Sequence, residues 1–203
     1  MHLNELILKV QNIDLPGRSA HKEMSFTDRN FEAPSTAIPS AVSILLFEKN
    51  NTIYFPLIKR TENSHHHKGQ IALPGGRKEL NESLEECAIR ETCEELGLTS
   101  DSIKIIRSLS SLYIPVSNHL VYPYLCYISE NPEFSFNNNE VEKIILCNLN
   151  DLIHFQKQIV KVKITDNAII EAPSFIYKQE VIWGATALIL NEWRKILLKL
   201  SIV

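Results

Sequence analysis

Three glutamates stand close together behind a Pro-Gly-Gly turn in this chain: Glu91, Glu94 and Glu95. On a helix, residues at positions i, i+3 and i+4 share one face, so these carboxylates lie within side-chain reach of one another. Like charges at this spacing repel, and each pair costs roughly 0.2–0.5 kcal/mol. A divalent cation would offset this repulsion, and ligands that are all oxygen favour Mg²⁺ or Mn²⁺ over zinc. The alternative is a solvated amphipathic helix that is merely acidic.

The stretch from Gly76 to Leu98 is predicted to be a helix with both ends marked in the sequence. Gly75 and Gly76 after Pro74 allow a sharp entry, because glycine adopts positive φ without steric cost. Gly97, followed by polar residues, is predicted to be the C-cap.

The same stretch follows the order Gly-x5-Glu-x7-Arg-Glu-U-x-Glu-Glu-x-Gly-U, where U is a bulky apolar residue. This order resembles the Nudix box, and the departure is Thr92, where the pattern has an aliphatic residue. The motif is long and strict, and therefore far more specific than a lone glycine-rich turn. The resemblance implies an α/β fold, the Nudix-type α/β/α sandwich with a mixed sheet in a single domain. It also implies an enzyme, a pyrophosphohydrolase acting on acid anhydrides.

The resemblance further assigns roles to residues of the box. Glu91 and Glu95, then Glu94, with Gly76, are expected to hold Mg²⁺ or Mn²⁺, and Glu91 and Glu94 are expected to be catalytic. Glu91 is the first candidate for the general base, and a glutamate from a distant loop is the second. Glu140 is the distant acid singled out, with a solvated loop carboxylate as its alternative reading. The residues expected to be structural are Gly75, Glu82, Arg90 and Gly97.

Residues 56–76 resemble the additional signature of the coenzyme A pyrophosphatase branch of this family. The positions at the expected spacing are Arg60, Thr61, Gly69, Pro74, Gly75 and Gly76, and the departures are Pro56, Ile58 and Leu73. Residues 182–187, Ile-Trp-Gly-Ala-Thr-Ala, are similar to the Trp-Gly-x-Thr segment near the end of the same branch. This implies hydrolysis of the diphosphate bond of coenzyme A or its derivatives to adenosine 3′,5′-bisphosphate and 4′-phosphopantetheine.

The predicted substrate-binding residues precede the box and are Arg60, Lys68, Gly69 and His67. Arginine and lysine suit an anionic group such as the 3′-phosphate of coenzyme A. His67 ends a run of three histidines that begins at His65 and includes His66. Three consecutive residues rarely point at one metal centre, so substrate contact and a solvated loop are the main alternatives for this run.

Two other functions remain open from the sequence. The first is a Nudix pyrophosphatase that acts on ADP-ribose or a nucleotide sugar. The second is a non-catalytic Nudix module that binds a nucleotide, although such modules usually lose box carboxylates that are present here.

The composition limits the classes of binding partner that this chain can have. The net charge of −3 and the pI near 6.2 argue against sequence-independent nucleic-acid binding. No apolar run reaches the ~18 residues that span a membrane. The 4 cysteines form no Cys-x-x-Cys pair, which is typical of free thiols in a reducing cytoplasm. We therefore expect a cytoplasmic protein with a nucleotide-like small-molecule substrate; the oligomeric state, including a homodimer, is left open.

Periodicity predicts the remaining elements. Residues 1–36 should form a short amphipathic helix and an irregular lead-in. The resemblance implies that residues 37–203 form the Nudix hydrolase domain. A hairpin is expected around Lys49-Asn50-Asn51, and a C-terminal helix from Thr186 to Leu200. The other predicted strands are 70–73, 103–109, 120–128, 143–149, 160–164 and 174–177.

Overall fold

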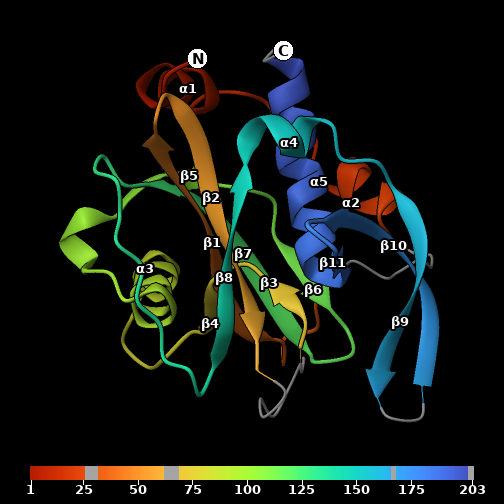
Figure 1. The fold of residues 1–203 in the computed structure, drawn as a ribbon. Helices are drawn as coiled ribbons and strands as arrows, with labels where there is room; N and C mark the ends of the chain where they lie inside the picture. Colours follow the sequence, from red (N-terminus) through yellow and green to blue (C-terminus); the bar gives the residue numbers. More distant parts are fainter. Residues whose placement is uncertain (26–31, 62–68, 166–167, 201–203) are drawn as a thin grey trace.

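A mixed sheet lies at the centre of a computed structural model that describes residues 1–25, 32–61, 69–165 and 168–200 (Figure 1). Its strand order is β3-β2-β1-β7-β5, and β4, β6 and β8 pair with β1, β7 and β2 respectively. β1 is parallel to β7 and antiparallel to β2 and β4, which confirms the mixed sheet. The strands are β1 Ile38–Lys49, β2 Thr52–Arg60, β3 Ile71–Ala72, β4 Gly75–Arg77, β5 Lys104–Ser108, β6 Leu112–Ile114, β7 His119–Tyr127 and β8 Val141–Asn148.

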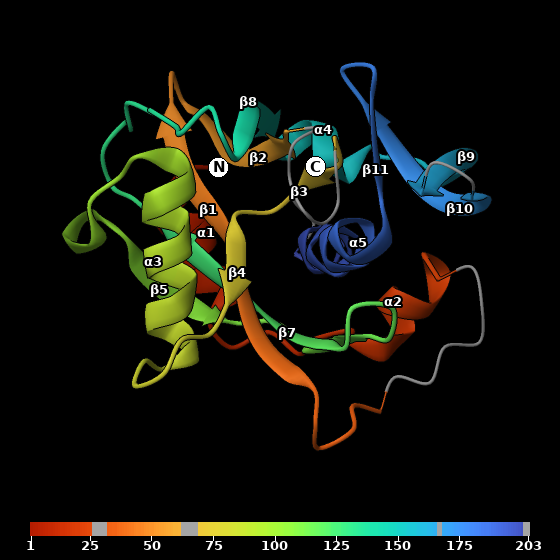
Figure 2. The same ribbon diagram turned by 90° about the horizontal axis from the view of Figure 1, so that it is seen from below.

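Helices cover both faces of this sheet. The described helices are α1 Leu3–Val10, α2 Arg18–Glu23, α3 Leu84–Leu96, α4 Leu149–Ile153 and α5 Gly184–Lys199, with a 3₁₀ turn at Ser100–Ser102. Figure 2 shows α3 on one side of β1 and β4 and α5 on the other side. The expected α/β/α sandwich is therefore confirmed.

The sequence of β1 explains why it is central. Its side chains alternate between faces, as in any strand, and both sets are apolar. Leu45 and Phe47 pack in the cluster that includes Cys87 and Leu96 of α3. Ile44 and Leu46 pack in the larger cluster that includes α5. A strand buried on both faces can hold a helix on each side, and this fixes α3 relative to the rest of the molecule.

The predicted hairpin between β1 and β2 is confirmed. Asn50 and Asn51 have φ values of 52° and 59°, the left-handed conformation that a tight hairpin turn of the I′ type requires. Asparagine tolerates this conformation better than most residues. The strands then pair antiparallel, with Phe47 opposite Tyr54.

A second, three-stranded sheet precedes the last helix. It consists of β9 Gln158–Thr165, β10 Ala168–Tyr177 and β11 Glu180–Trp183, in the order β11-β10-β9. Residues 160–164 were predicted to pair with 174–177, and this register is wrong. The two strands do pair antiparallel, but Val160 lies opposite Ala172 and Lys163 opposite Ile169, while residues 175–177 pair with β11. The predicted C-terminal helix is confirmed as α5, which begins directly after β11.

Several elements were not predicted: α2, α4, β6, β11, the 3₁₀ turn and the strand β4, whose residues were expected in the turn and the box helix. The helix α2 lies in the lead-in that was expected to be irregular. Most of its polar residues are exposed, but His21 is not: its Nε2 lies 3.2 Å from Glu192 Oε2 of α5, and both side chains are fully buried. α4 has 5 residues and β6 has 3, too few for either periodicity to emerge.

Among the described helices, none is long and apolar enough to cross a membrane.

All four cysteines are free thiols, as predicted. Burial raises the pKa of the Cys87 thiol to about 11.

Candidate active site

The Pro-Gly-Gly turn is held flat against β1. Gly75 and Gly76 in β4 pair with Val42 and Ala41, and Ser43 N–H donates to Pro74 O at 2.9 Å. Gly75 has a φ of 154°, and a Cβ there would lie 2.3 Å from Ala41 O. Gly75 is therefore required both by its backbone conformation and by the close approach of β1.

The box helix is shorter than predicted, because the chain is a strand at 75–77 and a loop before α3 begins at Leu84. Ser83 is the N-cap, and its hydroxyl accepts from Glu86 N–H while the Glu86 carboxylate accepts from Ser83 N–H. This capping box satisfies two backbone donors and so starts the helix there. Gly97, at φ 66°, is the predicted C-cap.

Arg90 joins the loop to the helix. Its Nε and Nη2 atoms donate to the two carboxylate oxygens of Glu82 at 3.0 and 2.9 Å, and Nη2 also donates to Arg77 O at 3.2 Å. The hydrogen bonds from Arg90 lower the pKa of Glu82 to about 2. Bidentate contacts of this kind are the strong form of the arginine–carboxylate pair. Arg90 and Glu82 thus occupy the positions expected of residues that hold the loop.

The third nitrogen of Arg90 reaches the acidic face of α3. Nη1 donates to Glu91 Oε1 at 3.0 Å and to Glu94 Oε2 at 3.3 Å. The side chain of Glu94 is 58% exposed, whereas that of Glu91 is 17% exposed. Arg90 therefore reduces the repulsion between two carboxylates that α3 places side by side.

Glu95 is the most deeply buried acid of the box, at 4% exposure. Its Oε2 accepts from Gly75 N–H at 2.9 Å, and its Oε1 accepts from Arg60 Nη2 at 3.2 Å. The same Arg60 nitrogen donates to Gly75 O at 3.2 Å. Burial raises the pKa of Glu95 to about 7, although Arg60 and the Gly75 N–H act in the opposite direction.

Gly76 brings the backbone against Glu91. A Cβ at this position would lie 2.4 Å from the Glu91 carboxylate, so a larger residue here would displace that side chain. Burial raises the pKa of Glu91, with Arg90 acting in the opposite direction. The two glycines of the turn therefore each face one box acid: Gly75 faces Glu95, and Gly76 faces Glu91.

The donor chemistry of this face suits Mg²⁺ or Mn²⁺. The carboxylates of Glu91 and Glu95 lie beside the Gly75–Gly76 backbone, and oxygen donors of this kind are the ligands that these ions prefer. Among the described residues, no group of three His, Cys, Asp or Glu side chains is arranged to hold a metal ion. The carboxylates of Glu91 and Glu95 are suitable ligands for the ion. In this structure Arg90 and Arg60 neutralise the negative charge that a bound ion would neutralise instead.

Some of the other predicted site residues lie near the turn, and the rest fall outside the residues that the structure describes. Arg60 contacts Glu95, and Gly69 is in a turn at φ 63° before β3. Glu140 is exposed, its backbone carbonyl accepts from Thr61 N–H at 3.1 Å, and its charge contributes to raising the pKa of Glu95. The residues that lie outside the described part of the chain are His65, His66, His67 and Lys68.

Besides the Arg60–Glu95 contact, two further contacts of this region were not foreseen. The hydroxyl of Thr92 is buried, donates to Ala88 O and lies 2.5 Å from Ser43 Oγ on β1. The departure from the box at this position is thus matched by a polar residue on the neighbouring strand. Thr186, in the first turn of α5, donates to Ile71 O at 3.2 Å. The similarity of residues 182–187 to the Trp-Gly-x-Thr segment was the sequence signal for Thr186, but not for its partner.

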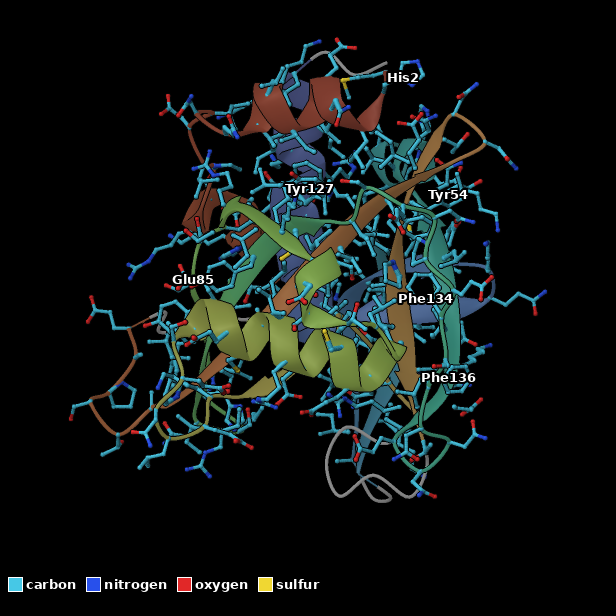
Figure 3. All side chains as sticks on the ribbon, turned by 90° about the vertical axis from the view of Figure 1, so that its left-hand side faces the viewer. His2, Tyr54, Glu85, Tyr127, Phe134 and Phe136 are labelled. Atoms are coloured by element: carbon cyan, nitrogen blue, oxygen red, sulfur yellow. The ribbon has the colours of Figure 1, made fainter. Side chains whose placement is uncertain are left out.

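Aromatic side chains close the C-terminal end of α3. Phe134 and Phe136 lie there, whereas Glu85 lies near its start (Figure 3). The Phe134 ring packs edge-on against Phe47 of β1 with centroids 5.5 Å apart, and Ser135 N–H donates to Leu96 O at 3.0 Å. The loop before β8 therefore fixes the end of the helix that carries the acids.

Comparison with known proteins agrees with this architecture. The sequence model of the NUDIX domain matches residues 37–168. Nudix hydrolase 3 of Caenorhabditis elegans is 27% identical over 152 residues, which cover 67% of this chain and 63% of that protein. A probable Nudix hydrolase of Schizosaccharomyces pombe is 30% identical over 139 residues, 68% of this chain and 48% of that protein. The matched part thus spans less than two thirds of both relatives.

Solved structures agree on the fold. The Nudix hydrolase RenU from M. smegmatis superposes with a TM-score of 0.55 at 13% identity, covering 82% of this chain and 88% of that one. A MutT/nudix family protein from Enterococcus faecalis gives 0.53 at 18% identity, covering 89% and 72%. At such identities the likeness shows the fold alone. Because the domain match covers more than half of the chain and falls on the box described above, this protein belongs to the Nudix hydrolase family.

Proposed function

We propose that this chain is a divalent-metal-dependent pyrophosphohydrolase that cleaves the diphosphate bond of coenzyme A or its derivatives. The observation that carries the chemistry is the placement of Glu91 and Glu95 against the Gly75–Gly76 turn. Buried carboxylates with raised pKa values, gathered at one turn, are typical of functional sites.

Glu91 and Glu95 would hold Mg²⁺ or Mn²⁺, with Glu94 and the backbone of Gly76 as further donors. Such an ion, when bound, offsets charge on diphosphate oxygens and lowers the pKa of a bound water. Glu94 is the most exposed of the three acids and is therefore the least fixed in position.

The chain's own residues position this chemistry. Arg90 holds the loop at Glu82 and orients Glu91, so that one carboxylate oxygen of Glu91 is fixed. Glu91 is the first candidate for the general base, because its raised pKa brings a carboxylate closer to the pH at which bases work efficiently. Glu140, on the exposed loop beside Thr61, is the second candidate.

The proposed substrate rests on residues 56–76. The three departures from the coenzyme A signature, Pro56, Ile58 and Leu73, are all buried. They therefore bear on packing of the core, but as departures from the signature they keep ADP-ribose or a nucleotide sugar as the alternative substrate. Arg60, which the signature shares, lies at the acidic face itself.

The test is a chromatographic product analysis with Mg²⁺ or Mn²⁺. Coenzyme A, ADP-ribose, NADH and a nucleotide sugar are offered in parallel, with Glu95→Gln as the blank. Adenosine 3′,5′-bisphosphate that forms from coenzyme A, and only with Glu95 intact, supports the proposal. A higher kcat/KM for ADP-ribose or the nucleotide sugar than for coenzyme A would refute the proposed substrate and would leave the proposed hydrolysis of a diphosphate bond unchanged. Nucleotide binding without any turnover would contradict the proposed enzymatic activity and would favour a non-catalytic binding module.

A further inference from the structure

Arg60, Glu95 and Gly75 form a closed ring of hydrogen bonds. Gly75 N–H donates to one oxygen of Glu95, Arg60 Nη2 donates to the other oxygen, and the same nitrogen donates to Gly75 O. Every group in the ring has a partner, so Glu95 is held in a single position. The ring joins three parts of the chain: the end of β2, the Pro-Gly-Gly turn and the last turn of α3.

Arg60 lies on the solvent side of this ring. Its side chain is 26% exposed, whereas that of Glu95 is 4% exposed. The opposite side is closed by backbone, since a Cβ on Gly75 would lie 2.3 Å from Ala41 O and 2.6 Å from Val42 Cα. A cation that approaches Glu95 from solvent therefore meets the guanidinium first.

The charges that act on Glu95 are of both signs. Glu91 and Glu140 both act on Glu95 as like charges, and Arg60 is the cation that opposes them. Arg60 also acts favourably on Glu91. The guanidinium thus supplies the positive charge that a divalent ion would supply when bound.

We propose that Arg60 and the divalent metal compete for Glu95, so that the metal binds only when the guanidinium leaves the carboxylate. This inference rests on the proposed function, because it takes Glu95 as a ligand. Once released, Arg60 is free to contact a phosphate of the substrate, for which its planar fork is well suited. Metal binding and the availability of Arg60 for an anionic ligand are therefore coupled, and such coupling acts equally in both directions.

The competition is tested by metal binding without substrate. Mn²⁺ affinity is measured by calorimetry and by the loss of the free Mn²⁺ resonance signal, for the wild type and for Arg60→Gln. The variant is expected to bind Mn²⁺ about tenfold more tightly, within the usual range of coupling between sites. Equal or weaker binding by a folded Arg60→Gln protein would overturn the proposal.

Loss of a positive charge raises cation affinity by itself, so a matched control is required. Lys59→Gln removes the neighbouring charge on β2, which pairs with Glu142 at 3.2 Å and not with the box acids. This variant is expected to stay within about twofold of the wild type, since screened charges at a distance contribute little. An equal gain in both variants would show general electrostatics and would overturn the competition.

A second measurement uses the unaltered sequence. In protein labelled with ¹⁵N-arginine, the Arg60 Nε resonance, assigned by its loss in Arg60→Gln, is expected to shift on titration with Mg²⁺. A resonance that stays unchanged while Mg²⁺ binds would contradict release of the guanidinium. A wild type that binds neither ion would instead refute the metal of the proposed function, so the two failures are distinguishable.

Discussion

Two arginine–glutamate pairs hold the box, and the pKa values of their two carboxylates are shifted in opposite directions. Arg90 meets Glu82 through two nitrogens, at a loop where the carboxylate is 14% exposed. Arg60 meets Glu95 through one nitrogen, which it shares with a backbone carbonyl, at a carboxylate that is 4% exposed. The first pair lowers the pKa of Glu82 to about 2, whereas Glu95 keeps a raised pKa of about 7.

The difference shows that the same two residue types can make a fixed contact or a replaceable one. Where an arginine satisfies both oxygens and water still reaches the pair, the carboxylate is stabilised as an anion. Where burial outweighs a single shared hydrogen bond, the carboxylate remains short of positive charge. This contrast agrees with our proposal that Arg90–Glu82 is structural and that Glu95 is a metal ligand.

The largest effect is expected from Glu95→Gln. The amide keeps the shape and accepts from Gly75 N–H, but it removes the charge of a ligand. We expect kcat to fall by about 10²–10³-fold, the range for loss of a group that stabilises charge in a transition state. Circular dichroism should show an unchanged fold. Full turnover in this variant would place the metal elsewhere.

Substitutions at the two glycines of the turn are expected to affect different properties: stability at Gly75 and activity at Gly76. Gly75→Ala forces a Cβ against β1 at a φ of 154° and should lower the free energy of unfolding by about 3 kcal/mol or more. Gly76→Ala meets only the flexible end of Glu91, so it should fold well and lose about tenfold or more in kcat through misplacement of that carboxylate. Urea denaturation and steady-state kinetics on both variants measure this contrast. A stable, fully active Gly76→Ala protein would remove Glu91 from the site.

Glu82→Gln tests the fixed pair through its pH dependence. Because folding lowers the pKa of Glu82 from 4.5 to about 2, its ionised form stabilises the fold above about pH 4.5, and this contribution is lost as the pH falls towards 2. We expect the variant to be about 1–2 kcal/mol less stable at pH 7, a modest value because solvent reaches the pair. The difference from the wild type should disappear near pH 2. A difference that persists at low pH would refute the role of the charge.

The smallest effect concerns Thr92 and Ser43. Thr92→Val alone leaves the buried Ser43 hydroxyl without this partner and should cost about 1–2 kcal/mol. The double variant Ser43→Ala, Thr92→Val removes both groups, and its cost should be below about 1 kcal/mol. Thermal unfolding of the single and double variants measures the coupling. Strictly additive losses would show that the two hydroxyls do not act as a pair.

Prediction from the sequence succeeded where the signal was local. The Asn50–Asn51 turn, the Gly97 cap and the helical spacing of Glu91, Glu94 and Glu95 depend on residues that are neighbours along the chain. The start of α3 was placed too early, because the Ser83–Glu86 capping box was overlooked in favour of the glycine turn.

Contacts between distant segments were beyond sequence reasoning. Arg60 and Glu95 are 35 positions apart, and nothing in either sequence segment indicates that the two side chains form a hydrogen bond. The same holds for α2, whose polar sequence suggests solvent although its His21 is buried against Glu192 of α5. Burial decides the pKa of Glu95, and burial is a property of the fold.

The assignment of the two pairs is tested most directly by Mn²⁺ titration of the wild type, Glu95→Gln and Glu82→Gln, followed by electron paramagnetic resonance. We predict that Glu82→Gln keeps Mn²⁺ affinity within about threefold, while Glu95→Gln loses about tenfold or more, at least the loss that follows removal of a group that merely orients a ligand. An equal loss in both variants, or unchanged affinity in Glu95→Gln, would contradict the distinction between a structural pair and a metal ligand.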